Sequence, residues 1–273
     1  MSPLPVVDGD RLASGRETSR VSFTYSDVDA GEDPADAIRW QERVDGWPQI
    51  KAYKRRVVER LSGARAVIDV GCGPGVDVLD FGTGRCVGVD RSMAMCAAAL
   101  RRGAVVARAD AGSLPFADET FDGAYADRVL QHVPSPMQVL GEMARVLRSG
   151  GRLVIADPDQ ETLVIHVPEV PPELVGRVKA LRRDVGYRNG RLASSLPAVL
   201  ATMGMVEVSV DAFVLLLTDP DEAFGIAGWP RLWQATGTFS PEEIDRWERA
   251  VGRSREGGFL YSLIYLVVAA TAP

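Results

Sequence analysis

The stretch VIDVGCGPGVD, Val67 to Asp77, decides the fold. In it an apolar run leads directly into Gly71, Gly73 and Gly75. Glycine adopts positive φ values and lets a ligand approach the backbone, and a helix that follows such a loop presents its N-terminal amides to that ligand. The stretch therefore predicts a strand, a loop and a helix that together hold a nucleotide-like group.

The composition is that of an ordinary globular protein. The chain has 273 residues, of which 46% are hydrophobic, so a sizeable core can form. Its net charge of −6 gives no reason to expect a nucleic-acid partner, because such partners are usually bound by a basic surface. The short basic clusters Lys54–Arg56 and Leu181–Arg183 are expected to be solvated helix faces.

Cysteines and termini give mainly negative information. Cys72, Cys86 and Cys96 form no C-x-x-C pair, and the chain has two histidines, so we expect reduced thiols, a cytoplasmic location and no metal site. The first twenty residues lack the apolar core of a signal peptide and are expected to be a flexible tail. The longest apolar run, residues 258–273, is too short to cross a membrane and is expected to be a buried strand.

Short apolar runs alternate with helical patterns along the first 160 residues. Because short apolar strands of this kind are typical of a parallel sheet covered on both faces, the alternation predicts a doubly wound α/β sheet. Ligands of such sheets bind at the carboxyl ends of the strands. The expected strands are 66–70, 86–90, 105–109, 123–126 and 152–156, and the expected helices are 92–102 and 135–148, with Ser92 and Ser135 as their N-caps.

The residues directly after each strand are therefore candidates for the site. Asp90 ends the second strand, 19 residues after Gly71, where a carboxylate can accept hydrogen bonds from ribose hydroxyls. The glycine loop and Asp90 are both compatible with NAD. Val76, however, stands where the dinucleotide fingerprint requires glycine or alanine.

Two further strand ends favour a different cofactor. Asp110 can accept a hydrogen bond from an exocyclic amine, and the backbone amide of Ala111 can donate to a ring nitrogen, so this pair suits adenine. Asp127 follows the fourth strand, where its carboxylate could meet an ammonium or sulfonium group. A pairing with the adjacent Arg128 is the alternative role for Asp127.

Four motifs occur in order between about residues 66 and 158, a third of the chain: VIDVGCGPGVD, VGVDRS, RADAGSLPFADETFDGAYADRVLQHV and VLRSGGRLVIADP. Together they resemble the class I S-adenosylmethionine-dependent methyltransferases, in the branch similar to ubiquinone and menaquinone C-methyltransferases and bacterial natural-product methyltransferases. The resemblance implies a Rossmann-like, seven-stranded and mostly parallel sheet with an antiparallel last strand and a helical lid. Residues 206–217 and 259–271 would be strands six and seven.

The resemblance also implies the cofactor and its contacts. S-adenosylmethionine would be held by the glycine loop at its methionine half, by Asp90 at the ribose, by Asp110 and Ala111 at the adenine, and by Asp127 beside the methionine. The first helix, within VDVLDFGTGR, is shorter than is usual in the family. The full set of expected cofactor contacts is Gly71, Cys72, Gly73, Gly75, Asp90, Arg91, Asp110, Ala111, Asp127 and Tyr25.

Two regions are expected. Residues 1–62 would be the flexible tail and N-terminal lid helices, and residues 63–273 would be the methyltransferase domain with helical insertions after strands five and six. A homodimer is compatible with the sequence.

The acceptor has to be inferred from weaker signals. The fourth strand is followed by ADRV, not by the Asn/Asp-Pro-Pro-aromatic box associated with methylation of adenine or glutamine amides. Aromatic residues ahead of the core and between strands six and seven favour a small, partly apolar acceptor such as a polyketide, quinone, terpenoid or indole, in bacterial secondary metabolism. We expect Trp229, Trp233 and His132 to contact it.

His132 is also the candidate general base, because histidine can take a proton from a hydroxyl near neutral pH. A packing or capping role is the alternative for this residue. Two other functions remain open from the sequence: an enzyme of the same fold that binds S-adenosylmethionine without transferring its methyl group, such as a cyclase, and an NAD-dependent oxidoreductase.

Overall fold

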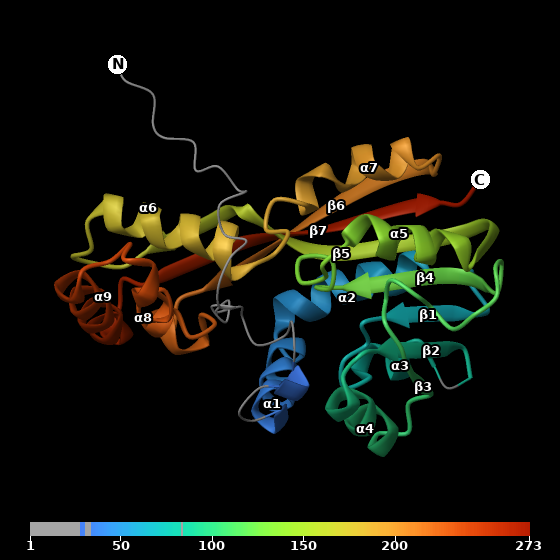
Figure 1. The fold of residues 1–273 in the computed structure, drawn as a ribbon, viewed down its shortest axis with the longest axis horizontal. Coiled ribbons are helices and arrows are strands. Elements are labelled where there is room, and N and C mark those ends of the chain that lie inside the picture. Colours follow the sequence, from blue (N-terminus) through green and yellow to red (C-terminus); the bar gives the residue numbers. More distant parts are fainter. Residues whose placement is uncertain (1–27, 31–33, 83) are drawn as a thin grey trace, which may run out of the picture.

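A seven-stranded sheet organises the computed structural model, which describes residues 28–30, 34–82 and 84–273. The strand order is β3-β2-β1-β4-β5-β7-β6, and β7 runs antiparallel to both of its neighbours while the other pairs in β1 to β5 are parallel (Figure 1). The expected doubly wound sheet with an antiparallel last strand is thereby confirmed. Its strands are β1 (Val67–Val70), β2 (Cys86–Asp90), β3 (Val106–Arg108), β4 (Phe121–Asp127), β5 (Leu147–His166), β6 (Val206–Leu217) and β7 (Leu260–Thr271).

Helices cover both faces of this sheet. Alternate residues of the strands point into two apolar clusters, one beneath α2 and α3 and the other beneath α5 and α7. The α-helices are α1 (Pro34–Asp45), α2 (Pro48–Arg60), α3 (Val76–Asp80), α4 (Met93–Arg101), α5 (Pro136–Arg145), α6 (Pro172–Leu181), α7 (Leu196–Thr202), α8 (Trp229–Leu232) and α9 (Pro241–Arg253). A π-helical turn, Arg182–Gly186, continues α6, and 3-10 turns lie at Val28–Ala30, Ala193–Ser195, Pro220–Glu222, Ile226–Gly228, Gln234–Thr236 and Ser254–Glu256. None of the helices described is long and apolar enough to cross a membrane.

The helix α2 differs from the expected lid. Ile50, Tyr53 and Val57 on this helix are almost completely buried, and they belong to the same cluster as Val67 of β1. Burial of three large side chains stabilises the fold by several kcal/mol, at about 1.5–3 kcal/mol each. In the structure, α2 is therefore part of the core.

The strand β5 is much longer than the five residues expected at 152–156. It continues to His166, because residues 157–166 pair with the first half of β7 across an irregularity between Asp159 and Val164. Polar residues in DPDQET interrupt the apolar pattern there, so the sequence gives no local sign of a strand. This part of β5 is therefore stabilised by its pairing with β7 and not by a local sequence preference for a strand.

The extended ends of β5, β7 and β6 form a lobe with α6, α8 and α9, at the left of Figure 1. Leu163 and Ile165 of β5 pack there with Leu174 and Val178 of α6. The lobe also buries most of the aromatic residues that follow β6, namely Trp229, Trp233, Phe239 and Trp247. This lobe lies beside the carboxyl ends of the central strands. The lobe and these strand ends together enclose a cavity.

Candidate active site

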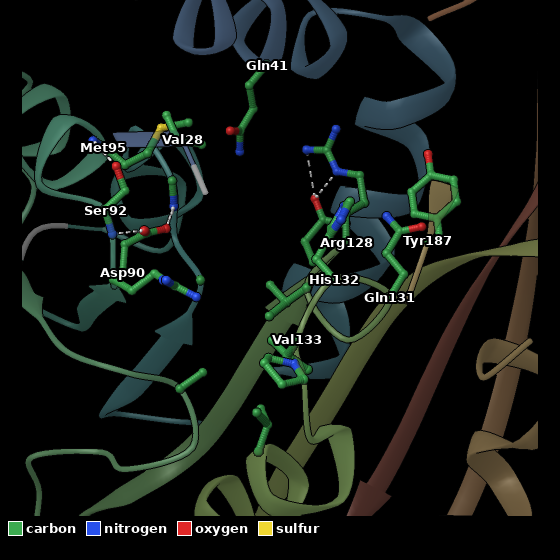
Figure 2. Close-up of a pocket in the computed structure, with 18 of the residues that line it drawn as sticks. Val28, Gln41, Asp90, Ser92, Met95, Arg128, Gln131, His132, Val133 and Tyr187 are labelled. Atoms are coloured by element: carbon green, nitrogen blue, oxygen red, sulfur yellow. Dashed lines mark hydrogen bonds and ion pairs between the residues drawn. The ribbon is translucent and has the colours of Figure 1, made fainter. Parts of the chain in front are cut away.

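A cavity of about 480 Å³ lies at the carboxyl ends of β1, β2 and β4. Its walls come from the loops after these strands, from α1 and from the lobe. Figure 2 shows two facing sides with Gln41 above them: Val28, Asp90, Ser92 and Met95 lie on one side, and Arg128, Gln131, His132 and Tyr187 lie on the other. Ligand sites of small molecules are typically 300–1,000 Å³, so the cavity can hold a nucleoside-sized group and a small second molecule.

The loop after β1 exposes backbone to this cavity. Gly71 and Gly73 line it and have φ values of 76° and 51°, which favour glycine. A Cβ on Gly71 would collide with the side chain of Val129, and one on Gly73 would lie 2.6 Å from the amide of Gln41. Both positions favour glycine for conformation, and at Gly71 the packing of Val129 also leaves no space for a side chain.

The other two expected contacts of this loop, Gly75 and Cys72, point away from the cavity. A Cβ on Gly75 would lie 2.8 Å from the Cβ of Ala99 on α4, so this glycine allows the loop to pack against a helix. The buried side chain of Cys72 packs against Gly88, where an added Cβ would lie 2.6 Å from its Sγ. Neither residue lines the cavity, in contrast to the contacts expected from the sequence.

Asp90 closes the end of β2 and fixes the glycine loop. Its Oδ2 accepts a hydrogen bond from the backbone amide of Gly73 at 2.9 Å, and its Oδ1 accepts from that of Ser92 at 2.8 Å. Burial raises the pKa of Asp90, and the two amides oppose this effect. A carboxylate has about four acceptor positions, so Asp90 retains capacity for two hydroxyl donors.

Asp110 and Ala111, expected to bind adenine, line the cavity after β3. The Oδ1 of Asp110 accepts a hydrogen bond from the backbone amide of Gly112 at 2.8 Å, which holds the turn. Arg91 also lines the cavity, and its carbonyl accepts from Nε of Arg108 at 3.0 Å. Tyr25, the remaining expected contact, lies outside the described residues.

A buried charge cluster lies next to the glycine loop. Lys54 on α2 contacts Asp77 at 2.8 Å, Asp45 at 3.0 Å and Asp127 at 3.5 Å. Burial raises the pKa of Asp77 to about 6, against the opposing effect of Lys54. The expectation that Lys54 belongs to a solvated helix face is wrong, because α2 packs against the sheet with this side chain inward.

Asp127 belongs to the same cluster and also lines the cavity. Its two carboxylate oxygens accept from the hydroxyl of Tyr53 at 2.8 and 3.0 Å, and Nε of Arg128 donates to it at 3.1 Å. Arg128 has a φ of 57°, an uncommon value for a side chain-bearing residue, which is found disproportionately at functional sites. Both roles considered for Asp127 from the sequence are therefore compatible with its position.

His132 lines the opposite side of the cavity, with its ring 5.3 Å from that of Tyr187. Burial lowers the pKa of His132 to about 4, and the nearby charges of Arg128 and Arg182 act in the same direction. The imidazole is therefore neutral at pH 7. The expectation of a base with a pKa near neutrality needs correction, since the site disfavours the protonated ring.

Beyond His132, a buried polar network reaches into the lobe. Nε2 of Gln160 donates to Oε1 of Gln131 at 3.0 Å, and Arg182 donates to Oε1 of Gln160 and to the hydroxyl of Tyr187, the latter at 3.2 Å. All four residues line the cavity. Sequence reasoning missed them and assigned Arg182 to a solvated face, which is wrong because its side chain is 1% exposed.

A signal for Arg182 is nevertheless visible in the sequence. Leu174 and Val178 form the buried stripe of α6, and Arg182 follows at the same spacing of four residues. An arginine on the buried stripe of a helix is an exception to the rule that charged side chains remain in water. Such an exception marks a candidate for function.

The tryptophans expected at the substrate lie elsewhere. Trp229 and Trp233 are buried in the lobe and do not line the cavity, and Nε1 of Trp229 donates to the carbonyl of Phe224 at 2.8 Å. Trp40 of α1 and Phe224 provide the aromatic wall instead, with ring centroids 6.0 Å apart. The sequence pointed to the right segments, but packing decides which rings face inward.

Comparisons with known proteins agree with this geometry. A family model described as "Methyltransferase domain" matches residues 68–155. The chain is 29% identical over 254 residues to the "Uncharacterized 37.1 kDa protein in transposon TN4556" of Streptomyces fradiae, with 87% of this chain and 72% of the relative covered. It is 35% identical over 157 residues to the O-methyltransferase rstn1 of Aspergillus nomiae, with 49% of this chain and 70% of the relative covered.

Solved structures support the fold. A putative methyltransferase from Bacillus halodurans superposes with a TM-score of 0.56 at 19% identity, covering 81% of this chain and 98% of the other. At this level of identity the likeness establishes the shared architecture of the sheet and its helices.

Proposed function

Because the chain belongs to the class I S-adenosylmethionine-dependent methyltransferases, we propose that it transfers a methyl group to a small, partly apolar acceptor bound in the cavity beside the cofactor. The family's cofactor is S-adenosylmethionine, which decides against the dinucleotide alternative. The acceptor, the roles of individual residues and a place in bacterial secondary metabolism are part of the proposal, and the cytoplasmic location stays a prediction.

The residues present fit the cofactor. Gly71 and Gly73 line the cavity and expose backbone to it, and the carboxylate of Asp90 retains acceptor capacity for the ribose hydroxyls. Below the loop, Oδ2 of the buried Asp69 has no hydrogen-bond partner among the described residues, and burial raises the pKa of this carboxyl. A cationic ammonium group placed near Asp69 and Asp127 would compensate this excess of carboxylates.

One observation carries the proposal: a single cavity is lined at one side by the residues proposed to hold the cofactor and at the other by residues suited to a small acceptor. Trp40, Phe224 and Leu263 supply apolar surface there, and Gln131 and Gln160 supply polar groups. A site of mostly apolar walls with a few placed polar groups is typical for small molecules. The named O-methyltransferase among the relatives supports a hydroxyl as the accepting group.

The chain's contribution to such a reaction is mainly positional. When bound, the cofactor supplies an activated methyl group and a neutral thioether leaving group, so no protein acid is required. The walls of the cavity hold the acceptor in line and exclude water. His132 can form a hydrogen bond with an acceptor hydroxyl as a neutral ring, but its lowered pKa makes it a weak proton acceptor.

A binding and product assay tests the proposal. Calorimetry should detect binding of S-adenosylmethionine and S-adenosylhomocysteine and none of NADH. The enzyme is then incubated with S-adenosylmethionine and phenols, quinols, terpenoid alcohols and indoles, and the products are analysed by mass spectrometry. The expected result is a product in which a methyl group replaces one hydrogen, a net gain of CH2, formed together with one equivalent of S-adenosylhomocysteine and one proton released to solvent. A chemically altered product without the added methyl would contradict methyl transfer and favour the non-methylating alternative.

A further inference from the structure

Arg182 occupies an unusual place in the lobe. It opens the π-helical turn Arg182–Gly186, directly after α6. Short π-helical turns are rare and are found often at functional sites. Here the first residue of the turn is a cation that continues the buried stripe of α6 and lines the cavity, although it is 1% exposed.

The guanidinium of Arg182 is held in one orientation. It donates to Oε1 of Gln160 and to the hydroxyl of Tyr187. Its Cζ lies 4.7 Å from the ring centroid of Trp229, 5.0 Å from that of Tyr187 and 5.7 Å from that of Tyr261. Aromatic faces and neutral oxygens interact favourably with a cation, so these contacts fix the position of the guanidinium.

The charges of the cavity are distributed unevenly. Its carboxylates, Asp90, Asp110 and Asp127, all come from the ends of β2, β3 and β4. Asp127 is already bound by Tyr53 and Arg128. Among the described residues that line the cavity, those contributed by β5 and the later elements include no carboxylate. Among these described lining residues of β5 and the later elements, Arg182 carries the one formal charge.

We propose that Arg182 binds a carboxylate of the acceptor, so that the substrates of this enzyme are small molecules that carry both a carboxylate and the group to be methylated. This inference rests on the proposed methyl transfer and specifies its substrate class. A planar guanidinium matches a carboxylate with two parallel hydrogen bonds, which fixes both the position and the direction of the bound molecule. Gln160 and Tyr187 act as positioning residues for Arg182.

Matched pairs of ligands test this on the native enzyme. With S-adenosylhomocysteine present, calorimetry compares 4-hydroxybenzoate with 4-hydroxybenzamide, and indole-2-carboxylate with indole-2-carboxamide. Each pair keeps shape and changes charge. We expect each acid to bind at least tenfold more tightly than its amide. Equal affinities within both pairs, or binding of S-adenosylhomocysteine without measurable binding of either acid, would overturn the proposal.

Variants then assign the preference to one side chain. Arg182→Gln should reduce the acid-to-amide ratio to about one, and Arg182→Lys should leave an intermediate ratio because the charge remains without the planar fork. Arg188→Gln, an exposed arginine six residues further along, should keep the native ratio. An undiminished ratio in Arg182→Gln would contradict the assignment.

The affinity of each variant for S-adenosylhomocysteine reports whether it is folded. If Arg182→Gln does not fold, the comparison of acids with amides on the native enzyme still decides the substrate class, and Arg182→Lys decides the residue. Failure of the native enzyme to bind S-adenosylhomocysteine would contradict the proposed function itself. Binding of S-adenosylhomocysteine without a preference for acids over amides would contradict only the role of Arg182.

Discussion

Asp90 combines two tasks that a single substitution can test. Its carboxylate holds the amides of Gly73 and Ser92 and is proposed to accept the ribose hydroxyls. We expect Asp90→Ala to weaken binding of S-adenosylmethionine by about 1–3 kcal/mol, the typical effect of losing hydrogen bonds to a charged group. Calorimetry measures the change, with the exposed Asp80→Ala as control. Unchanged affinity in Asp90→Ala would remove this residue from the cofactor site.

His132 should make stability depend on pH in a defined window. Its pKa is about 4 in the folded chain and 6.5 in the reference state, so between these values the unfolded chain binds more protons. The stabilising contribution of the neutral ring is therefore complete above pH 6.5 and is lost as the pH falls to about 4. Urea denaturation at several pH values should show this loss, of about 1–3 kcal/mol, in the native chain and not in His132→Gln. Parallel curves for the two proteins would contradict it.

Residues at or just after the ends of the central strands could be assigned to the cavity from the sequence. Gly71, Asp90 and Asp110 line the cavity because the carboxyl ends of parallel strands meet at one edge, a relation that spacing along the chain reveals. Gln160 and Tyr187 could not be found this way. Their place depends on the long-range pairing of β5 with β7, which no local pattern specifies.

The helix α2 is attached to the cofactor loop by Lys54. Removing the charge in Lys54→Met would leave Asp45, Asp77 and Asp127 buried with less compensation, so we expect the free energy of unfolding to fall by about 3–5 kcal/mol. Lys51→Met, on the exposed face of the same helix, should change it by less than about 0.5 kcal/mol. Urea denaturation near pH 7 compares the two variants.

A small loss in Lys54→Met, similar to that in Lys51→Met, would mean that the carboxylates are compensated by other groups. Loss of the Lys54 charge should also affect binding of the cofactor. Asp127 lines the cavity and also contacts Lys54, so a destabilised cluster should reduce affinity for S-adenosylmethionine in the same variant.

Many of the elements followed from the sequence, but the helix expected at 135–148 ends at Arg145, and Ser135 before it makes no side-chain cap hydrogen bond. The strands β2 and β6 have the expected bounds, and α4 begins after Ser92, whose hydroxyl accepts from the amide of Met95 at 3.1 Å. These elements carry continuous apolar runs or a capping residue, which are local signals. The second half of β5 carries none, and α2 was misjudged because an amphipathic pattern does not reveal what covers a helix.

Amide hydrogen exchange should be faster in α1 than in α2 when the protein is free. The helix α2 buries Ile50, Tyr53 and Val57, so its amides should exchange as slowly as those of β4. The helix α1 buries fewer side chains and places Gln41 over the glycine loop, so it should exchange faster in the free protein and slow down when S-adenosylhomocysteine binds. Equal exchange of α1 and α2 in the free protein would contradict this division.

The continuous strand β5 has a consequence for how such enzymes diversify. It leaves the central sheet beyond Ala156 and carries Gln160 into the lobe, where Arg182, Tyr187 and Phe224 follow later in the chain. These residues lie outside 68–155, the part that the family model matches. Under the proposed function, sequence changes confined to residues 159–259 would therefore alter the acceptor preference and leave the glycine loop unchanged.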